Sequence, residues 1–365
     1  MKNDWSPVII KNFQKSLLEW YKTNARPLPW RSTKDPYFIW ISEIMLQQTR
    51  VDTVIQYFPT FVKKYPTISS LASADIQNIL CSWQGMGYYK RAVNIYKTAN
   101  IIYNDYQGNF PESYQEMLTL PGIGEYTAGA IASISFHQAV PAVDGNIKRV
   151  ISRIFFITED VNVRNTDKKI RAQVNQMIPN HCPGEFNQAL MEIGAIICTP
   201  RKPTCQSCPM QIHCLAAAKK QQDLLPIKGK KNKPKVFSIE TAIVKNQNKL
   251  LLVRRSNHGL LAGLWGLPMI NISSQFSNGN DVLDKIIKQY RLDIKEKPIL
   301  LNQLTHIFTH QIWKIHLYLI YINDNHELMK PYLRWVEKKE LKKFPIPKAF
   351  QKCLKEYFKS PLVQR

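Results

Sequence analysis

Long apolar runs are missing from this chain of 365 residues. None reaches the roughly 20 residues that a membrane-spanning helix needs. The first residues, MKNDWSPVIIKNF, also lack the uninterrupted apolar core of a secretory signal peptide. We therefore expect a soluble protein of the cytoplasm that has no membrane partner.

Acidic residues are scarce in this sequence. The chain has 27 Asp and Glu residues against 50 Lys and Arg residues, which gives a formal net charge of +23. This excess carries no information about the fold, but it favours a polyanionic partner. Nucleic acid is the first expectation, ahead of an anionic membrane surface.

We expect no disulfide framework, because the seven cysteines are odd in number and the chain shows no export signal. Four of them are clustered between residues 198 and 214 as Cys198-x6-Cys205-x2-Cys208-x5-Cys214. Four thiolates suit either tetrahedral zinc or an iron–sulfur cluster. Structural zinc sites of four cysteines usually use two C-x-x-C pairs, and only one occurs here, which favours [4Fe–4S].

The loop TPRKPT between the first two clustered cysteines contains Arg201 and Lys202. A cluster that orders this basic loop would create a phosphate contact without redox chemistry. A role in stability alone is the alternative. The three scattered cysteines are expected to be small buried side chains: Cys81, Cys182 and Cys353.

The length of the chain indicates two or three domains. Helical periodicity dominates as far as the cysteine cluster, which predicts an all-α domain over residues 1–222 with a cluster loop at 198–214. Residues 223–235, DLLPIKGKKNKPK, read as a Lys- and Pro-rich linker. From 236 to 360 the apolar period changes to two, which predicts an α+β domain with a hairpin, a helix over 280–290 and a strand over 312–322.

The stretch LTLPGIGEYTAGAIASISFHQAVPAVDGN (118–146) places a Pro-Gly-x-Gly turn between two segments of helical spacing. Gly122 and Gly124 permit positive φ and a close backbone approach. The helix that follows would point its free N–H groups at the turn and form an anion site. Asp144 lies shortly after, in AVDGN. A plain connection between helices with a capping Asp is the alternative.

A second carboxylate occurs in the segment PYFIWISEIMLQQTR, where Asp35 and Pro36 predict the start of a helix. Residues 37–46 are apolar almost all round, which suits a Glu43 that faces a cleft inside a helical bundle. A solvent-facing Glu43 on an amphipathic helix is the alternative. Upstream, two prolines in ARPLPWR enforce an extended path from which Arg26, Trp30 and Arg31 project.

A second glycine-flanked turn, GMGYYKR (85–91), combines two aromatic residues with two cations. Glycine, aromatic rings and positive charge together suit a nucleic-acid surface. An ordinary interhelical turn is the alternative.

Together these motifs resemble the helix-hairpin-helix DNA glycosylase superfamily and, within it, the MutY family of adenine DNA glycosylases rather than the endonuclease III branch. The resemblance extends over essentially the whole chain. It rests on the cysteine spacing and on four further motifs: SEIMLQQT (42–49), GMGYYKRA (85–92), LPGIGEYTAGAIAS (120–133) and VDGN (143–146).

The resemblance implies base excision repair, in which a monofunctional enzyme flips out and removes adenine paired with 8-oxoguanine or guanine. Glu43 matches the general acid that protonates adenine N7, a role that requires a buried carboxyl of raised pKa. Asp144 matches the carboxylate that stabilises the oxocarbenium-like sugar. Tyr126 and Asn146 match residues that support Asp144 and the sugar.

The resemblance also implies a cofactor and DNA contacts. It implies a [4Fe–4S] cluster on the four clustered cysteines. Arg31 and Gln188 match positions around the adenine pocket, and Gln48 and Tyr88 match residues that wedge into the base stack. The full set of expected substrate and DNA contacts in the helical domain is Arg26, Trp30, Arg31, Gln48, Tyr88, Gly122, Gly124 and Gln188.

A lysine is missing at position 126, where lyases of this superfamily carry one for Schiff-base chemistry. Tyr126 therefore predicts an enzyme that leaves the strand intact. The Mg²⁺-binding Nudix signature is also missing from 259–296, so the Nudix-like second domain is not expected to hydrolyse pyrophosphates. Phe308, Thr309 and His310 match the family's 8-oxoguanine recognition loop, with Thr in place of Ser. A β-turn with chance aromatics is the alternative.

Two other classes of function are weighed. A non-catalytic, cluster-bearing protein that inspects lesions is disfavoured because both carboxylates are present. A bifunctional lyase for oxidised pyrimidines is disfavoured by Tyr126 and by the second domain. The expected partner is double-stranded DNA with an A:8-oxoguanine or A:G mispair, bound by a monomer associated with the nucleoid if the source is bacterial. A sliding clamp or repair factor would bind through the linker.

Overall fold

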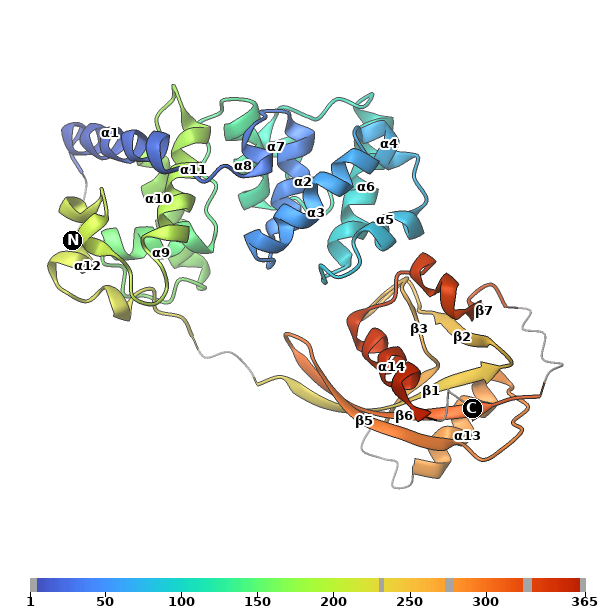
Figure 1. The fold of residues 1–365 in the computed structure, drawn as a ribbon. Coiled ribbons are helices and arrows are strands. Elements are labelled where there is room, and N and C mark those ends of the chain that lie inside the picture. The colour runs from blue at the N-terminus through green and yellow to red at the C-terminus, as the bar shows by residue number, and fades with distance from the viewer. Residues whose placement is uncertain (1–4, 230–232, 273–278, 324–329, 362–365) are drawn as a thin grey trace. The chain divides into compact units, whose positions relative to one another are not determined.

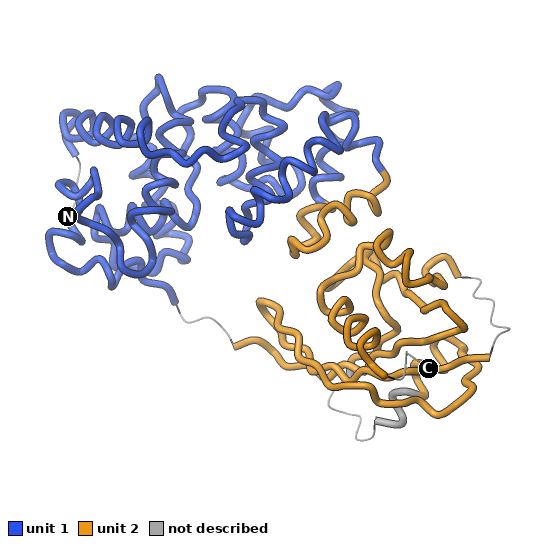
Figure 2. Tube along the Cα trace, in the orientation of Figure 1, with its two compact units in different colours: residues 1–74, 94–230 blue, residues 75–93, 231–365 orange. Residues whose placement is uncertain are grey.

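A computed structural model describes residues 5–229, 233–272, 279–323 and 330–361. The chain forms two compact units (Figure 2). The first combines residues 1–74 with 94–230, and the second combines 75–93 with 231–365. Residues 230–232 of the predicted linker lie outside the described part. Among the described residues, no helix has the length and apolar character needed to cross a membrane.

The first unit is built from helices, as predicted (Figure 1). Those that carry the site are α2 (Pro36–Leu46), α8 (Glu125–Ser135), α9 (Gly145–Ile154) and α11 (Pro183–Ile196). The other helices that lie wholly in this unit are α1 (Pro7–Asn24), α3 (Val51–Lys64), α4 (Ile68–Ala72), α7 (Tyr114–Met117), α10 (Arg164–Met177) and α12 (Leu215–Ala218).

Local sequence signals set the helix starts. The Asp35 carboxylate accepts a hydrogen bond of 2.8 Å from the Tyr37 amide, and Pro36 occupies the first turn of α2, as predicted. Helix α2 is buried over nearly its whole length, in agreement with its apolar sequence. Helices α1, α9, α10 and α11 share one apolar core that includes Phe13, Ile151 and Leu190.

The second unit contains a seven-stranded sheet in the order β3-β2-β1-β6-β5, with β4 paired to β1 and β7 paired to β2. Its centre is the parallel pair β1 (Lys235–Asn246) and β6 (Gln311–Tyr321). The remaining strands are β2 (Lys249–Arg254), β3 (Trp265–Gly266), β4 (Met269–Ile272), β5 (Ile299–Ile307) and β7 (Leu333–Glu337). The predicted hairpin is the tight β1–β2 turn, in which Asn246 pairs with Lys249.

The alternation of side chains places one apolar set on each face of this sheet. Ile243 and Trp313 share a core with Phe350 of α14 (Lys348–Lys359), while Val244 shares a core on the other face with Ile286 of α13 (Gly279–Tyr290). The predicted fold class, a helical domain followed by an α+β Nudix-like domain, is confirmed.

The second unit also includes α5 (Ile76–Ser82) and the start of α6 (Lys90–Asp105). Gln77 accepts a hydrogen bond of 3.0 Å from the Trp265 indole, and the Gln84 amide donates one of 3.2 Å to the Ile346 carbonyl. Of the three scattered cysteines, Cys353 is fully buried as expected, whereas Cys81 and Cys182 are only partly buried.

Candidate active site

Glu43 lies in the middle of α2 and is 5% exposed, so the cleft-facing alternative was the right one. Its carboxylate accepts a hydrogen bond from the hydroxyl of Tyr126, the second residue of α8. Burial raises the pKa of Glu43 to about 7; Asp144 adds to this rise, whereas the Tyr126 hydrogen bond and Arg31 oppose it. A carboxyl of this kind is protonated in a substantial fraction of molecules at neutral pH.

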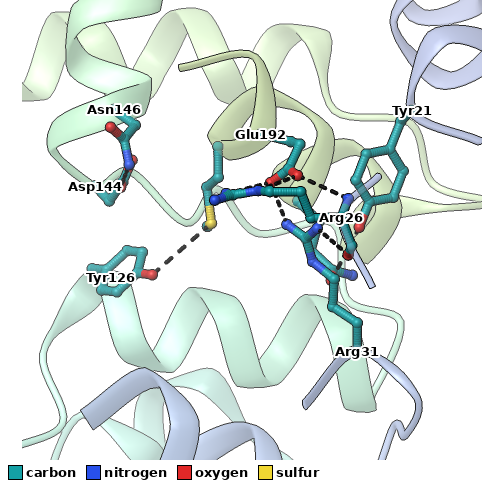
Figure 3. Close-up of polar contacts among 9 residues, drawn as sticks. Tyr21, Arg26, Arg31, Tyr126, Asp144, Asn146 and Glu192 are labelled. Carbon is teal, nitrogen blue, oxygen red and sulfur yellow. Dashed lines mark hydrogen bonds and ion pairs between the residues drawn. The ribbon is translucent and has the colours of Figure 1, made fainter. Parts of the chain in front are cut away.

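Asp144 is the N-cap of α9, so the capping role offered as an alternative is real. Oδ1 accepts a hydrogen bond of 2.7 Å from the Ile147 amide, and Oδ2 accepts one of 2.8 Å from the Asn146 side chain. Burial raises the pKa of Asp144, while these hydrogen bonds and Arg149 act against the rise. Because both oxygens accept hydrogen bonds, the carboxylate is held in one orientation, and Figure 3 shows it close to Tyr126.

Tyr126 interacts with both carboxylates rather than with Asp144 alone. Its hydroxyl binds Glu43 and lies 3.9 Å from the sulfur of Met191 on α11 (Figure 3). Burial raises the pKa of Tyr126 well above its usual range, with Glu43 and Asp144 adding to the rise. The phenol therefore stays neutral and remains a hydrogen-bond donor.

Two arginines form ion pairs with the buried Glu192, drawn together with Tyr126 and Asp144 in Figure 3. Arg26 makes two hydrogen bonds with the Glu192 carboxylate, at 2.7 and 2.9 Å, and Arg31 makes one at 2.7 Å. Burial would raise the pKa of Glu192, but hydrogen bonds from Arg26 and Arg31 outweigh it and lower the pKa to about 2. The two arginines are thus held in place by an ionised partner.

Glu192 was not predicted from the sequence. The signal was an acidic residue in the apolar part of the helix EFNQALMEIGAIIC, one turn after Gln188. Gln188 itself accepts a hydrogen bond of 3.3 Å from Tyr21, whose ring lies under the Arg31 guanidinium at 5.5 Å. Trp30, by contrast, is 5% exposed and packs its ring on Phe58, so it supports the loop from the core side.

Arg149 connects Asn146, which bonds Asp144, to the cysteine loop at Cys198. It too was not predicted. Its Nη2 donates to Asn146 Oδ1 at 2.9 Å and to the Gly194 carbonyl at 2.6 Å, while Nε donates to the Cys198 carbonyl at 2.7 Å. One turn later on α9, Arg153 donates to the Cys198 sulfur at 3.2 Å. The signal was two arginines four residues apart, each followed by an apolar residue, on one helix.

The two predicted glycines of the Pro-Gly-x-Gly turn differ in conformation. Gly122 has a φ of +82°, and a Cβ there would lie 2.8 Å from the Asn94 side chain, so glycine is required. Gly124 has a φ of −100° and is extended, so it does not use the positive φ that glycine permits. A Cβ on Gly124 would meet open space. Gly124 is the N-cap of α8 and provides no side-chain cap, which leaves the first amides of that helix available to an anion.

Gln48 and Tyr88, the two predicted wedge residues, share an unusual backbone conformation. Each has positive φ, +57° at Gln48 and +47° at Tyr88. Such a conformation is uncommon outside glycine and is concentrated at functional sites. Tyr88 is also an exposed aromatic residue.

Comparison with known proteins decides the family. Residues 41–180 match the profile of the HhH-GPD superfamily base excision DNA repair protein, and residues 241–356 match the NUDIX domain. The chain is 36% identical to an adenine DNA glycosylase of Buchnera aphidicola subsp. Schizaphis graminum, over 95% of this chain and 99% of that relative. The chain belongs to the adenine DNA glycosylase family.

Two further relatives support this conclusion. The human adenine DNA glycosylase is 30% identical over 95% of this chain and 74% of its own length. A thermostable thymine-DNA glycosylase of known structure is 32% identical and aligns with a TM-score of 0.53, over 57% of this chain and 97% of that one. The family resemblance stated from the motifs is confirmed, and the protein is a DNA glycosylase of base excision repair.

The four clustered cysteines of this glycosylase line a single cavity, together with apolar side chains such as Ile154 and Ile193. In the described parts of the chain, no three His, Cys, Asp or Glu side chains lie close enough to bind one metal ion. The chemistry of the donor set fits an iron–sulfur cluster: four cysteines line one apolar cavity, and Arg153 donates a hydrogen bond to the sulfur of Cys198. Hydrogen bonds to the sulfurs are a common feature of such clusters.

The recognition loop predicted in the second domain closes the β5–β6 hairpin of the glycosylase. Phe308 is anchored, because its ring packs against His306 at 4.5 Å and Trp313 at 4.8 Å. Thr309 and His310 are exposed at the tip. Within the same unit, the hydroxyls of Thr309 and Tyr88 are hydrogen-bonded at 2.7 Å.

Proposed function

We propose that this glycosylase hydrolyses the N-glycosidic bond of adenine opposite 8-oxoguanine and, more weakly, opposite guanine. The observation that carries the proposal is Glu43, a buried carboxyl with a pKa of about 7 beside a fixed second carboxylate, Asp144. A general acid is most effective when its pKa lies near the working pH.

The reaction uses the two carboxylates in sequence. Protonated Glu43 gives its proton to adenine N7, and the bond between C1′ and N9 breaks with its electron pair going to the base. The Asp144 carboxylate stabilises the oxocarbenium-like sugar, either electrostatically or as a short-lived adduct. Water then adds to C1′, and the Glu43 carboxylate accepts the proton that the water loses. The products are adenine and an abasic site.

The remaining residues position the substrate. Arg31 and Gln188 flank the adenine, and Asn146 orients Asp144. Gln48 and Tyr88 occupy the gap that the flipped base leaves, while the turn at Gly122 and Gly124 binds a phosphate. Tyr126 provides no amine for a Schiff base, so the enzyme leaves the strand intact.

We infer that the four cysteines bind a [4Fe–4S] cluster, which orders the loop that carries Arg201. The domains extend over residues 1–222 and 236–360, joined by the linker 223–235. The second domain reads the 8-oxoguanine strand through Thr309 and His310, whose hydroxyl and ring nitrogens can bond a base edge.

The central test is single-turnover release of adenine from a duplex with one A:8-oxoguanine pair. Glu43→Gln keeps the shape but cannot donate the proton, and Asp144→Asn removes the stabilising charge. We expect each to lower the rate by a factor of about 100 to 10,000, the usual contribution of such groups. No release by the wild type, or equal rates for Glu43→Gln, would refute the assignment.

Two further measurements test the finer statements. Borohydride should trap no covalent adduct between the wild type and DNA; trapping in high yield would indicate a lyase. Thr309→Val should reduce the preference for 8-oxoguanine over guanine. Thr305 is an exposed threonine on the preceding strand, and the control variant Thr305→Val should keep the preference. Equal preferences in the two variants would exclude a role for the Thr309 hydroxyl.

A further inference from the structure

A basic hollow lies at the end of the Nudix-like domain that is distant from Thr309. It has a volume of about 820 Å³ and lies between the β1–β2 turn, the segment after β7 and the end of α14. Its lining is Lys245, Asn248, Leu250, Glu337, Lys338, Lys339, Lys342, Tyr357 and Phe358. Four lysines against one glutamate leave an excess of three positive charges.

The acidic residues near the hollow are already engaged. Glu337 and Glu340 form a reciprocal cap at the start of the 3-10 helix Lys338–Lys343. Glu337 also pairs with Lys339 at 2.9 Å, and Glu340 pairs with Lys343 at 3.3 Å. Exposed pairs of this kind stabilise little, so Lys339 remains available to another anion. The Lys338 ammonium lies 4.5 Å above the Phe358 ring, which fixes its position.

The strand register gives the distance from the hollow to the recognition loop. Lys235 of β1 pairs with Gln311 next to the loop, and Lys245 at the hollow pairs with Tyr321. Ten residues of strand extend about 33 Å at roughly 3.3 Å per residue. This length equals about ten base pairs of duplex, at roughly 3.4 Å per pair.

We propose that this hollow is a second DNA contact, which binds the sugar–phosphate backbone of the duplex within about ten base pairs of the nucleotide at Thr309. Lysine ammonium groups bind phosphates as point charges. DNA held by the recognition loop would be present near the hollow at high effective concentration. The inference rests on the proposed function in taking DNA as the partner of this domain.

The test compares two double variants of the full-length protein. Lys339→Gln with Lys342→Gln removes two exposed charges of the hollow, and Lys288→Gln with Lys297→Gln removes two exposed charges elsewhere in the same domain. Binding to an A:8-oxoguanine duplex is measured as a function of salt. Each phosphate contact contributes about −0.9 to the slope of log affinity against log salt. We call the Lys339→Gln, Lys342→Gln protein the hollow variant. We expect its slope to be shallower than that of the wild type by about 1 to 2. The slope of the control variant should equal that of the wild type.

Duplex length sharpens the test. With 15 base pairs on each side of the mispair the hollow variant should bind more weakly than the control, and with 4 base pairs on each side the two should bind equally. The proposal would be overturned if the hollow variant and the control had equal salt slopes on the long duplex. It would also be overturned if the hollow variant bound DNA normally and had lost affinity only for an acidic peptide such as polyglutamate. Both variants should release adenine at the wild-type rate under saturating DNA. Failure of release by the wild type would refute the proposed function and not this contact.

Discussion

The hydroxyl of Tyr126 donates a hydrogen bond to the carboxylate of Glu43, from a residue 83 positions further along the chain. This bond favours the ionised form of Glu43, whereas burial favours the protonated form. The acid strength of Glu43 thus depends on opposing effects, of which the Tyr126 hydrogen bond can be removed by one substitution.

The first prediction concerns pH. In the proposed mechanism Glu43 acts as an acid, so the rate of adenine release should fall about tenfold per pH unit above its pKa of about 7. Tyr126→Phe removes a hydrogen bond that lowers this pKa, so the midpoint should move to higher pH. Tyr21→Phe, which removes a hydroxyl bonded to Gln188 in the same pocket, is the control and should leave the midpoint in place. A midpoint shift of equal size in both variants would contradict the role of Tyr126.

A second prediction concerns the orientation of Asp144. Asn146→Ala leaves Asp144 Oδ2 without its side-chain donor and Arg149 without one acceptor. A hydrogen bond to a charged group contributes about 1.5–3 kcal/mol, so we expect adenine release to slow by roughly 10- to 100-fold. Lys148→Gln is the matched control, because Lys148 is on the same helix but pairs with Asp167. The idea fails if the two variants release adenine equally fast.

The Pro-Gly-x-Gly turn allows a third prediction, since its two glycines have different requirements. Gly122→Ala places a side chain on a residue with left-handed backbone, which costs about 1–2 kcal/mol. The added Cβ would also clash with the Asn94 side chain. Its melting temperature should fall. Gly124→Ala fits the fold without strain, so its melting temperature should be unchanged while its affinity for DNA decreases. Wild-type affinity in Gly124→Ala would argue against a close approach of DNA to this turn.

Tyr88 is the subject of the fourth prediction. Tyr88→Gly removes the ring at a backbone conformation that glycine adopts freely, so adenine release should fall through loss of the wedge alone. Tyr88→Phe keeps the ring and loses only the hydrogen bond to Thr309. Its release rate should stay near that of the wild type while its preference for 8-oxoguanine weakens. A Tyr88→Phe variant as slow as Tyr88→Gly would show that the ring alone does not act as the wedge.

Local signals in the sequence were sufficient for the elements that carry the site. The Asp35-Pro36 start of α2, the tight β1–β2 turn and the apolar surroundings of Glu43 each depend on neighbours along the chain. The contacts between these elements were not predictable in the same way. Glu192 and Arg149 act through partners more than 40 residues away, and only packing of the helices brings those partners together.

The backbone conformation of single residues was also not predictable from the sequence alone. A Gly-x-Gly pattern does not state which glycine adopts positive φ, and it was Gly122 rather than Gly124. Likewise, positive φ at Gln48 and Tyr88 is imposed by the surrounding fold, because neither residue type favours it by itself.

Asp144 caps helix α9, which through Arg149 and Arg153 reaches the backbone and sulfur of Cys198. If the four cysteines hold the proposed [4Fe–4S] cluster, the supply of iron to the cell would bear on repair through this helix. On that proposal we expect protein produced in iron-poor medium to keep Glu43 and Asp144 and still release adenine slowly, because Arg149, which bonds Asn146, also bonds the Cys198 carbonyl of the cysteine loop. Iron content should accordingly be measured before any slow variant of this enzyme is assigned a chemical defect.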